Sequence, residues 1–148
     1  MARCVGRAAQ SLIPGANDSV LAPSTTRQSQ HVPLDTFKSN LVRMVDSVRS
    51  AYPDAHVILV NAPPVIPSVW HDIMAANAKR HGDPPPELDR TLEHSEQYAK
   101  ATLEVAADFQ SKQSSFGGKG AVHKVGAWDL VSKMAGGTEA DMLSKYYV

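Results

Sequence analysis

Only one cysteine occurs among the 148 residues, so the chain cannot form an internal disulfide. No apolar run approaches the roughly 18 to 20 residues that cross a bilayer, and the amino terminus has no apolar core typical of a secretory signal. Lysine and arginine together number 15, as do aspartate and glutamate, which leaves no excess positive charge for a polyanion. We therefore expect a cytoplasmic or otherwise intracellular protein that binds neither nucleic acid nor a membrane.

Clusters of metal-binding side chains are also lacking. The six histidines, at positions 31, 56, 71, 81, 94 and 123, include no pair at helical spacing, and no cysteine cluster accompanies them. The stretch "GGKGAVHK" has no Lys-Ser or Lys-Thr pair of the kind found in a phosphate-binding loop. The sequence therefore predicts neither a metal site nor a cofactor.

The clearest secondary-structure signals lie between residues 34 and 60. Apolar side chains recur every three or four residues from Leu34 to Tyr52, which predicts an amphipathic helix bounded by Pro33 and Pro53. The run "VILV" follows and is typical of a strand buried on both faces. This pattern predicts a parallel sheet covered by helices.

The rest of the chain completes an alternating order of elements. Residues 62–87 are rich in proline and predict a loop at the C-terminal end of the buried strand, where ligands bind in open α/β sheets. A second helix is predicted over residues 88–109, then a flexible linker or insertion over 111–120. A strand over 121–131 and a final helix over 138–148 give the order typical of the α/β class.

A turn with several polar side chains lies near the amino terminus, in "SLIPGANDSVL". Pro14, Gly15, Asn17 and Asp18 fall within five positions, where a chain readily turns and polar side chains can take part in chemistry. The local sequence leaves two interpretations open, a simple turn or part of an active site.

Four ordered motifs connect this turn with a known family. "GAND" is followed by "QHVPLDTFKSNL", then by "VILVNAPPV", and then by "DPPPELDR" with Tyr98 in the next helix. In these motifs, from about Gly15 to Phe109, the chain resembles the SGNH, or GDSL, hydrolases. It is most similar to the branch of isoamyl acetate-hydrolysing esterases. Because four motifs occur in order, a coincidental resemblance of a plain α/β domain is disfavoured.

The resemblance implies a three-layer α/β/α, flavodoxin-like fold and hydrolysis of a small ester by a Ser-Asp-His triad without a cofactor. It assigns Gly15 and Asn17 to the oxyanion-hole block, in which the asparagine amide donates a hydrogen bond to the negative oxygen. Asp18 is expected to support the turn by bonding to backbone N–H groups. His31, Pro63 and Trp70 are expected to line the pocket.

The family's nucleophile block, Gly-Asp-Ser, occurs nowhere in the sequence, and neither does its Asp-x-x-His block. We therefore expect residues 1–148 to form a single partial hydrolase domain, a truncated form without the first strands and inactive alone. Residues 1 to about 14 are expected to be poorly ordered, because their strand would lie at an exposed edge open to association with another chain. The alternative is a non-catalytic binding or regulatory module derived from the same fold.

Overall fold

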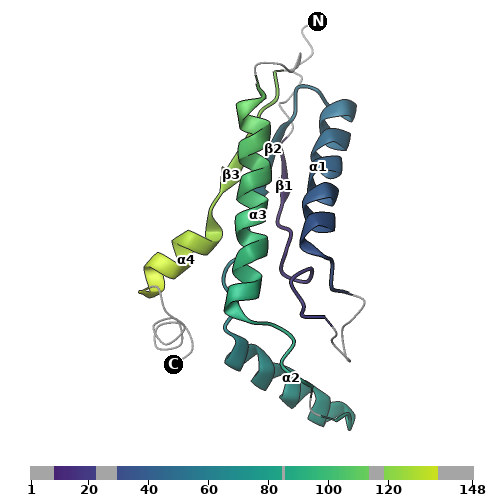
Figure 1. The fold of residues 1–148 in the computed structure, drawn as a ribbon, viewed down its shortest axis with the longest axis vertical. Helices are drawn as coiled ribbons and strands as arrows, with labels where there is room; N and C mark the ends of the chain where they lie inside the picture. The colour runs from purple at the N-terminus through teal and green to yellow at the C-terminus, as the bar shows by residue number, and fades with distance from the viewer. Residues whose placement is uncertain (1–8, 23–29, 85, 114–118, 137–148) are drawn as a thin grey trace, which may run out of the picture.

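The computed structural model describes residues 9–22, 30–84, 86–113 and 119–136 of the chain. Strands and helices alternate along most of this part of the chain, as the sequence predicts (Figure 1). The elements are β1 (Ala9–Leu12), α1 (Leu34–Ala51), β2 (His56–Val60), α2 (Pro67–His81), α3 (Leu92–Ser111), β3 (Val122–Val125) and α4 (Ala127–Ala135).

The three strands form a parallel sheet with β2 in the centre. Ala9 of β1 pairs with His56, and Val57 of β2 pairs with Val122 of β3. Helix α1 connects β1 to β2, and helix α3 precedes β3. The predicted α/β class is confirmed, and the small sheet is consistent with an incomplete flavodoxin-like fold.

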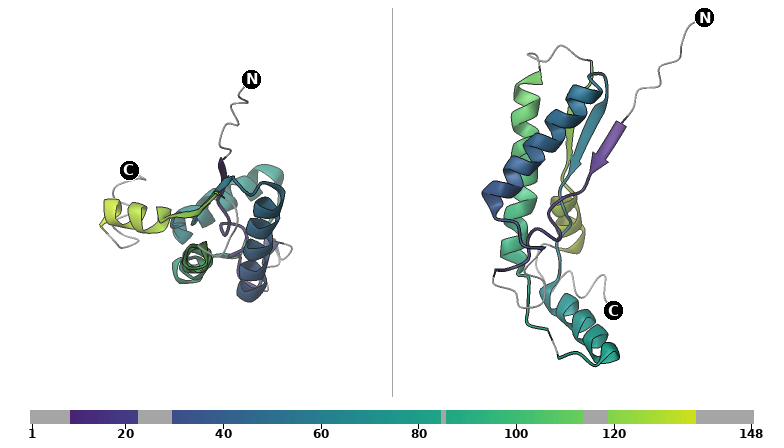
Figure 2. Two further views of the ribbon diagram at one scale, coloured as in Figure 1. Left: turned by 90° about the horizontal axis from the view of Figure 1, so that it is seen from above. Right: turned by 90° about the vertical axis from the view of Figure 1, so that its right-hand side faces the viewer.

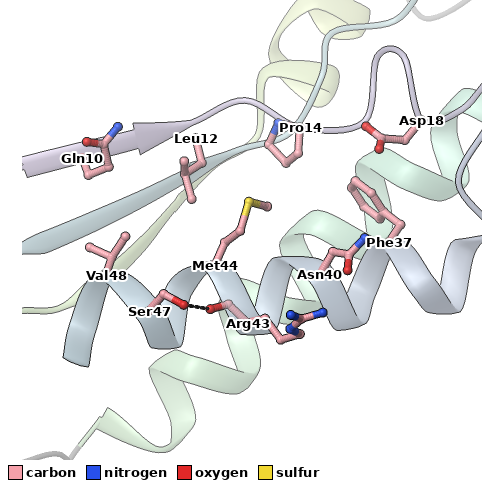
Figure 3. A pocket seen from close by; sticks show the side chains of 10 residues that line it. All are labelled: Gln10, Leu12, Pro14, Asp18, Phe37, Asn40, Arg43, Met44, Ser47 and Val48. Carbon is pink, nitrogen blue, oxygen red and sulfur yellow. Dashed lines mark hydrogen bonds between the residues drawn. The ribbon is translucent and has the colours of Figure 1, made fainter. Parts of the chain in front are cut away.

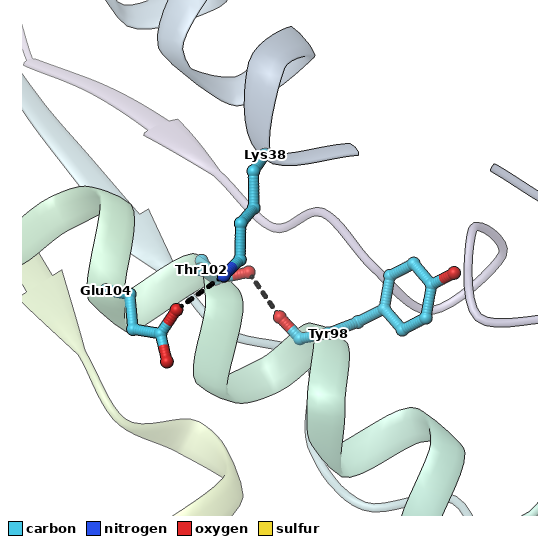
Figure 4. A network of polar contacts seen from close by, with 4 residues as sticks. All are labelled: Lys38, Tyr98, Thr102 and Glu104. Carbon is cyan, nitrogen blue, oxygen red and sulfur yellow. Dashed lines mark hydrogen bonds and ion pairs between the residues drawn. The ribbon is translucent and has the colours of Figure 1, made fainter. Parts of the chain in front are cut away.

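One face of the sheet packs against both long helices. The side chains of Val57 and Leu59 are fully buried there. Their partners come from α1, α3 and β3, and the core consists of Phe37, Leu41, Val45, Val57, Leu59, Tyr98, Ala101, Val105, Ala106, Phe109 and Val122. An exposed ion pair between Lys38 of α1 and Glu104 of α3, 2.7 Å long, also joins the helices and raises the pKa of Lys38 (Figure 4).

The prediction that the central strand is buried on both faces is wrong for the described part of the chain. Ile58 and Val60 point away from the core and are only half-buried. Crossovers between parallel strands are right-handed, and the strand order β1-β2-β3 advances in one direction, so α1 and α3 lie on the same face (Figure 2). Neither helix is therefore left to cover the second face.

The predicted loop over residues 62–87 contains helix α2, which is a further correction. Pro67 occupies the first turn, where its missing N–H costs nothing, and Gly82 ends the helix with a φ of 73° in the left-handed region. The prolines thus flank the helix and do not interrupt it. Because the whole segment is rich in proline, its composition predicts a loop and does not reveal the helix.

Helix α3 begins later than predicted, at Leu92 and not at residue 88. Thr91 explains the difference because its side chain accepts a hydrogen bond from the His94 backbone N–H, as an N-cap residue does. The helix extends to Ser111, the first residue of the predicted linker. Residues 114–118 of that linker lie outside the described residues.

The predicted strand over residues 121–131 is wrong in its second half. Strand β3 ends at Val125, and after Gly126 the chain enters helix α4. Buried Asn61 fixes this change of direction, because its Oδ1 accepts a hydrogen bond of 3.0 Å from the Trp128 backbone N–H. Its Nδ2 donates to the Ala99 carbonyl at 3.4 Å, which ties α4 and α3 to the end of β2.

Residues 9–12 at the start of the described chain form the edge strand β1. The expectation that residues 1 to about 14 are poorly ordered in solution stays a prediction. Residues 1–8 and the predicted final helix over 138–148 lie outside the described residues. Among the described helices, none combines the length and apolar character that crossing a membrane requires.

Candidate functional site

The turn predicted to be functional follows directly from the edge strand. β1 ends at Leu12, which pairs with Leu59, and Gly15 opens the turn three residues later. The turn therefore lies beyond the carboxyl ends of parallel strands, where open α/β sheets bind ligands.

Gly15 sets the path of the turn. Its φ is 104°, a conformation that residues with a Cβ adopt only with strain. A Cβ at this position would lie 3.5 Å from the Cβ of Tyr98 and 3.6 Å from the ring of Phe37, which is ordinary contact. The backbone angle, and not lack of space, therefore requires glycine here.

Asp18 closes the turn on itself. Its Oδ2 accepts a hydrogen bond of 3.1 Å from the Gly15 N–H, and the Ser19 N–H donates to the Gly15 carbonyl at 3.2 Å. The Val20 N–H in turn donates to the Asn17 carbonyl at 3.2 Å. These bonds fix the backbone on both sides of Asn17.

Residues distant in the sequence hold the turn in place. The Val32 N–H donates to the Asp18 carbonyl at 3.1 Å, and the Leu21 N–H donates to the Asp89 carbonyl at 2.8 Å. Helix α3 contributes Tyr98, whose hydroxyl donates to the Val32 carbonyl at 2.6 Å. Burial raises the pKa of Tyr98, with a smaller contribution from the charge of Asp18, so the phenol remains a donor at neutral pH.

Ala16 and Asn17 are the exposed residues of this anchored turn, and of the two only Asn17 has a polar side chain. Its side chain makes no hydrogen bond to another described residue, whereas its backbone carbonyl is bonded to Val20. An amide group on a fixed backbone that faces solvent can donate to a ligand without a charge of its own. The arrangement thus presents one neutral donor at the end of β1.

His31 and His94 lie beside the turn. Because a carbonyl can only accept, the contact between His31 Nδ1 and the Val20 carbonyl places the hydrogen on Nδ1. The two rings are nearly parallel with centroids 6.3 Å apart, and the rings of His94 and Tyr98 form an edge-to-face pair with centroids 5.3 Å apart. His31 therefore supports the backbone of the turn through its Nδ1 atom.

We expect the stability of the chain to fall as the pH drops below 6.5, because of His94. Burial lowers the pKa of His94 below its ordinary value of 6.5, with a smaller contribution from His31. The unfolded chain then binds more protons than the folded chain, so the free energy of unfolding decreases toward acid pH. Urea unfolding at about pH 7.5 and about pH 5.5 measures this difference.

His94→Gln should reduce that pH dependence, whereas His81→Gln, at an exposed position near the end of α2, should leave it unchanged. An identical decrease in both variants and in the parent chain would show that His94 is not the responsible group.

A groove of about 760 Å³ runs between β1 and α1 (Figure 3). Asp18 and Phe37 lie at the end near the turn, and Gln10 and Val48 lie at the other end. The remaining lining residues are Leu12, Pro14, Asn40, Arg43, Met44 and Ser47. The groove therefore opens beside the turn and follows β1, the edge strand of the described sheet.

The other two residues expected to line a pocket lie farther along the chain. Pro63 is exposed in the segment between β2 and α2. Trp70, on α2, donates from its indole N–H to Asp89 at 2.9 Å, and the Arg90 guanidinium lies 4.4 Å from the ring centroid. Since the Asp89 carbonyl binds the Leu21 N–H, Trp70 is linked to the end of the turn through Asp89.

The sequence places Tyr98 in one of the four motifs, but it does not predict the long-range contacts that hold the turn in place. The Tyr98 hydroxyl and its Val32 partner are 66 positions apart, and the contact between the hydroxyls of Ser19 and Ser95, at 3.4 Å, joins residues 76 positions apart.

Among the described residues, no group of three or more His, Cys, Asp or Glu side chains could hold a metal ion.

No family model matches the chain, and no solved structure does. It is 37% identical over 95 residues to the isoamyl acetate-hydrolyzing esterase 1 homolog of Rattus norvegicus, a match that covers 64% of this chain and 34% of that protein. The homolog of the same name from Homo sapiens is 32% identical over 95 residues, covering 64% of this chain and 35% of that protein.

A plant protein also matches. A GDSL esterase/lipase of Arabidopsis thaliana is 38% identical over 58 residues, which is 39% of this chain and 24% of that protein. The chain spans about a third of the length of the mammalian relatives. These matches and the parallel α/β sheet relate the chain to the SGNH/GDSL hydrolases.

Proposed function

We propose that the chain contributes one arm of the oxyanion hole of an SGNH/GDSL-type carboxylic ester hydrolase. The observation that supports this most strongly is the exposed Asn17 amide on a turn fixed at the carboxyl end of β1. The names of the relatives, which are esterases, agree with this chemistry. By resemblance, the substrate is a small ester and no cofactor takes part.

Ester hydrolysis needs such a donor because attack on the carbonyl carbon turns its oxygen into an oxyanion. A hydrogen-bond donor that is already in position stabilises this charge by about 3 to 4 kcal/mol. Asn17 suits the role because its Nδ2 donates two hydrogens and carries no charge. The bonds that fix its backbone mean that little reorganisation is needed when the charge develops.

The neighbouring residues have supporting roles in this proposal. Gly15 provides the positive φ that turns the chain after β1, and Asp18 holds the Gly15 N–H. We assign His31, Pro63 and Trp70 to the surroundings of the substrate. His31 acts through the backbone of Val20, and Trp70 acts through Asp89.

The nucleophile is not part of the proposal for these 148 residues. The sequence contains neither Gly-Asp-Ser nor Asp-x-x-His, the blocks from which the related hydrolases take the attacking serine and the histidine. We propose that these residues supply the scaffold and the Asn17 donor, and that turnover requires a serine and a histidine from another segment of polypeptide.

A chimera with a relative that is named as an esterase tests the role of Asn17. In the isoamyl acetate-hydrolyzing esterase 1 homolog of Rattus norvegicus, residues 15–109 of this chain would replace the corresponding segment. If Asn17 is an oxyanion donor, Asn17→Ala lowers the kcat of the chimera and changes the KM little. An unchanged kcat would remove Asn17 from the oxyanion hole.

The free edge of the sheet supports a second candidate function, a non-catalytic binding module. In the described part of the chain β1 pairs only with β2, and its Ser11 carbonyl accepts a hydrogen bond from the Gln10 side chain at 3.2 Å. β1 has no charged residue, and the chain has no formal net charge at pH 7, so a second copy would not be repelled. We propose a second copy as the occupant, with the two β1 strands antiparallel.

Association of two copies can be measured by size-exclusion chromatography with light scattering. The dimer fraction should rise with protein concentration and fall in Ser11→Lys, because a charge on the edge strand disfavours edge-to-edge pairing. A monomer at every concentration would exclude this second function.

A further inference from the structure

Two histidines meet on the sheet face that α1 and α3 leave uncovered. His123 of β3 is in register with Ile58 of β2, and His56 lies two residues before Ile58 on the same face. The Nδ1 atom of His56 is 2.9 Å from the Nε2 atom of His123, and the ring centroids are 5.1 Å apart. The pair is exposed, and adjacent strands of one sheet hold it.

At this distance the two nitrogens share one hydrogen. One nitrogen must donate and the other must accept, so at least one imidazole is neutral at the contact. The two nitrogens face each other, and each has a lone pair once its own hydrogen moves to the other nitrogen of its ring. Neutral imidazole nitrogens in this state are the commonest protein ligands of transition metals.

We propose that His56 and His123 form a two-histidine site for a divalent transition metal ion that favours nitrogen ligands at right angles, such as Ni²⁺ or Cu²⁺. Two nitrogens bound at about 2.0 to 2.1 Å and at 90° to each other are about 2.9 Å apart, and in a tetrahedral site they are about 3.4 Å apart. The two nitrogens are 2.9 Å apart across their hydrogen bond, so the right-angled arrangement requires the smaller change in their separation.

Metal binding requires only local changes. The shared hydrogen leaves the contact, so that His56 keeps its hydrogen on Nε2 and His123 keeps its hydrogen on Nδ1. Both rings rotate about their last side-chain torsion, which has a broad energy minimum, until the two lone pairs converge on the ion. Because the described residues offer no third ligand here, water completes the coordination.

The site depends on the fold and not on the local sequence. The two histidines are 67 positions apart, so no motif reveals them. Their side chains meet only because β2 and β3 are parallel neighbours with Ile58 in register with His123. Asn17 lies beyond the opposite ends of the strands, so metal binding by this pair does not depend on the role that we propose for Asn17.

Titration of the 148-residue chain with NiCl2 in a non-coordinating buffer tests the proposal, with isothermal calorimetry as the readout. We expect one Ni²⁺ ion per chain. His56→Gln and His123→Gln should each weaken binding about tenfold or more, because the remaining imidazole binds the ion without a second ligand held nearby on the same protein. In NMR spectra the paramagnetic ion should broaden the ring signals of His56 and His123 before those of other histidines.

His81→Gln is the matched control, since His81 is exposed at the end of α2 and unchanged binding is expected. Far-UV circular dichroism of each variant checks that the fold is kept. Absence of binding to the parent chain would overturn the proposal. So would binding that survives in the His56→Gln/His123→Gln double variant, or a loss in His81→Gln equal to that in the other two.

Discussion

We expect the 148-residue chain to hydrolyse p-nitrophenyl acetate no faster than buffer alone. Loss of the serine or the histidine of a catalytic triad lowers kcat by about 10⁶-fold in a well-studied protease. A complete oxyanion hole with bound substrate retains about 10³ to 10⁴ of acceleration over water, but here only one arm is proposed. The chain should therefore have no measurable turnover.

The measurement is the release of nitrophenolate at several substrate and protein concentrations. The parent chain and Asn17→Ala should give the same rate, because a single donor without a catalytic serine and histidine accelerates attack by water too little to measure. Saturable hydrolysis that Asn17→Ala abolishes would show that the chain contains a complete catalytic site.

Periodic sequence patterns predicted the elements that form the core. The helix expected over residues 34–52 is α1, and it ends at Ala51, one residue earlier. The apolar run after Pro53 is β2. Both predictions succeed because burial against the sheet requires an apolar stripe on a helix and β-branched side chains in a parallel strand.

The predictions failed where single residues decide the structure. Helix α2 depends on where Pro67 and Gly82 fall relative to its ends, and the proline content of the segment suggested a loop. The change from β3 to α4 depends on the bond between Asn61 and the Trp128 N–H, which joins residues 67 positions apart. The placement of α1 and α3 on one face of the described sheet follows from strand order, which the apolar periodicity of the sequence does not report.

The sequence predicts part of the candidate site. Turn chemistry and the family resemblance point to Gly15, Asn17 and Asp18, and the proposed roles of these residues in catalysis stay predictions. The contacts that anchor the turn, such as Tyr98 with Val32, come from distant segments and required the fold. The same is true of His56 and His123, which the sequence analysis did not connect.

The second large effect is expected in the chimera that combines residues 15–109 with the flanking segments of the rat esterase homolog. Asn17→Ala should lower its kcat for isoamyl acetate by about 10² to 10³, the usual result of removing one oxyanion donor. The KM should change little, because the ground-state carbonyl oxygen needs this donor less than the oxyanion does. The turn itself should remain, since its hydrogen bonds use the backbone of Asn17 and not its side chain.

Asn40→Ala is the matched control for this substitution. Asn40 is also an exposed asparagine, and it lines the groove beside α1, so its loss should leave kcat within about twofold of the parent chimera. A similar decrease in both variants would indicate a general disturbance of the fold and not the loss of a donor.

The ratio of kcat between the parent chimera and Asn17→Ala, measured with isoamyl acetate at saturating concentration, tests the oxyanion role of this turn most directly. Our account predicts a ratio of about 100 to 1,000. A ratio near one, with the parent chimera active, would contradict it and would leave Gly15, Asn17 and Asp18 as a turn without a part in catalysis.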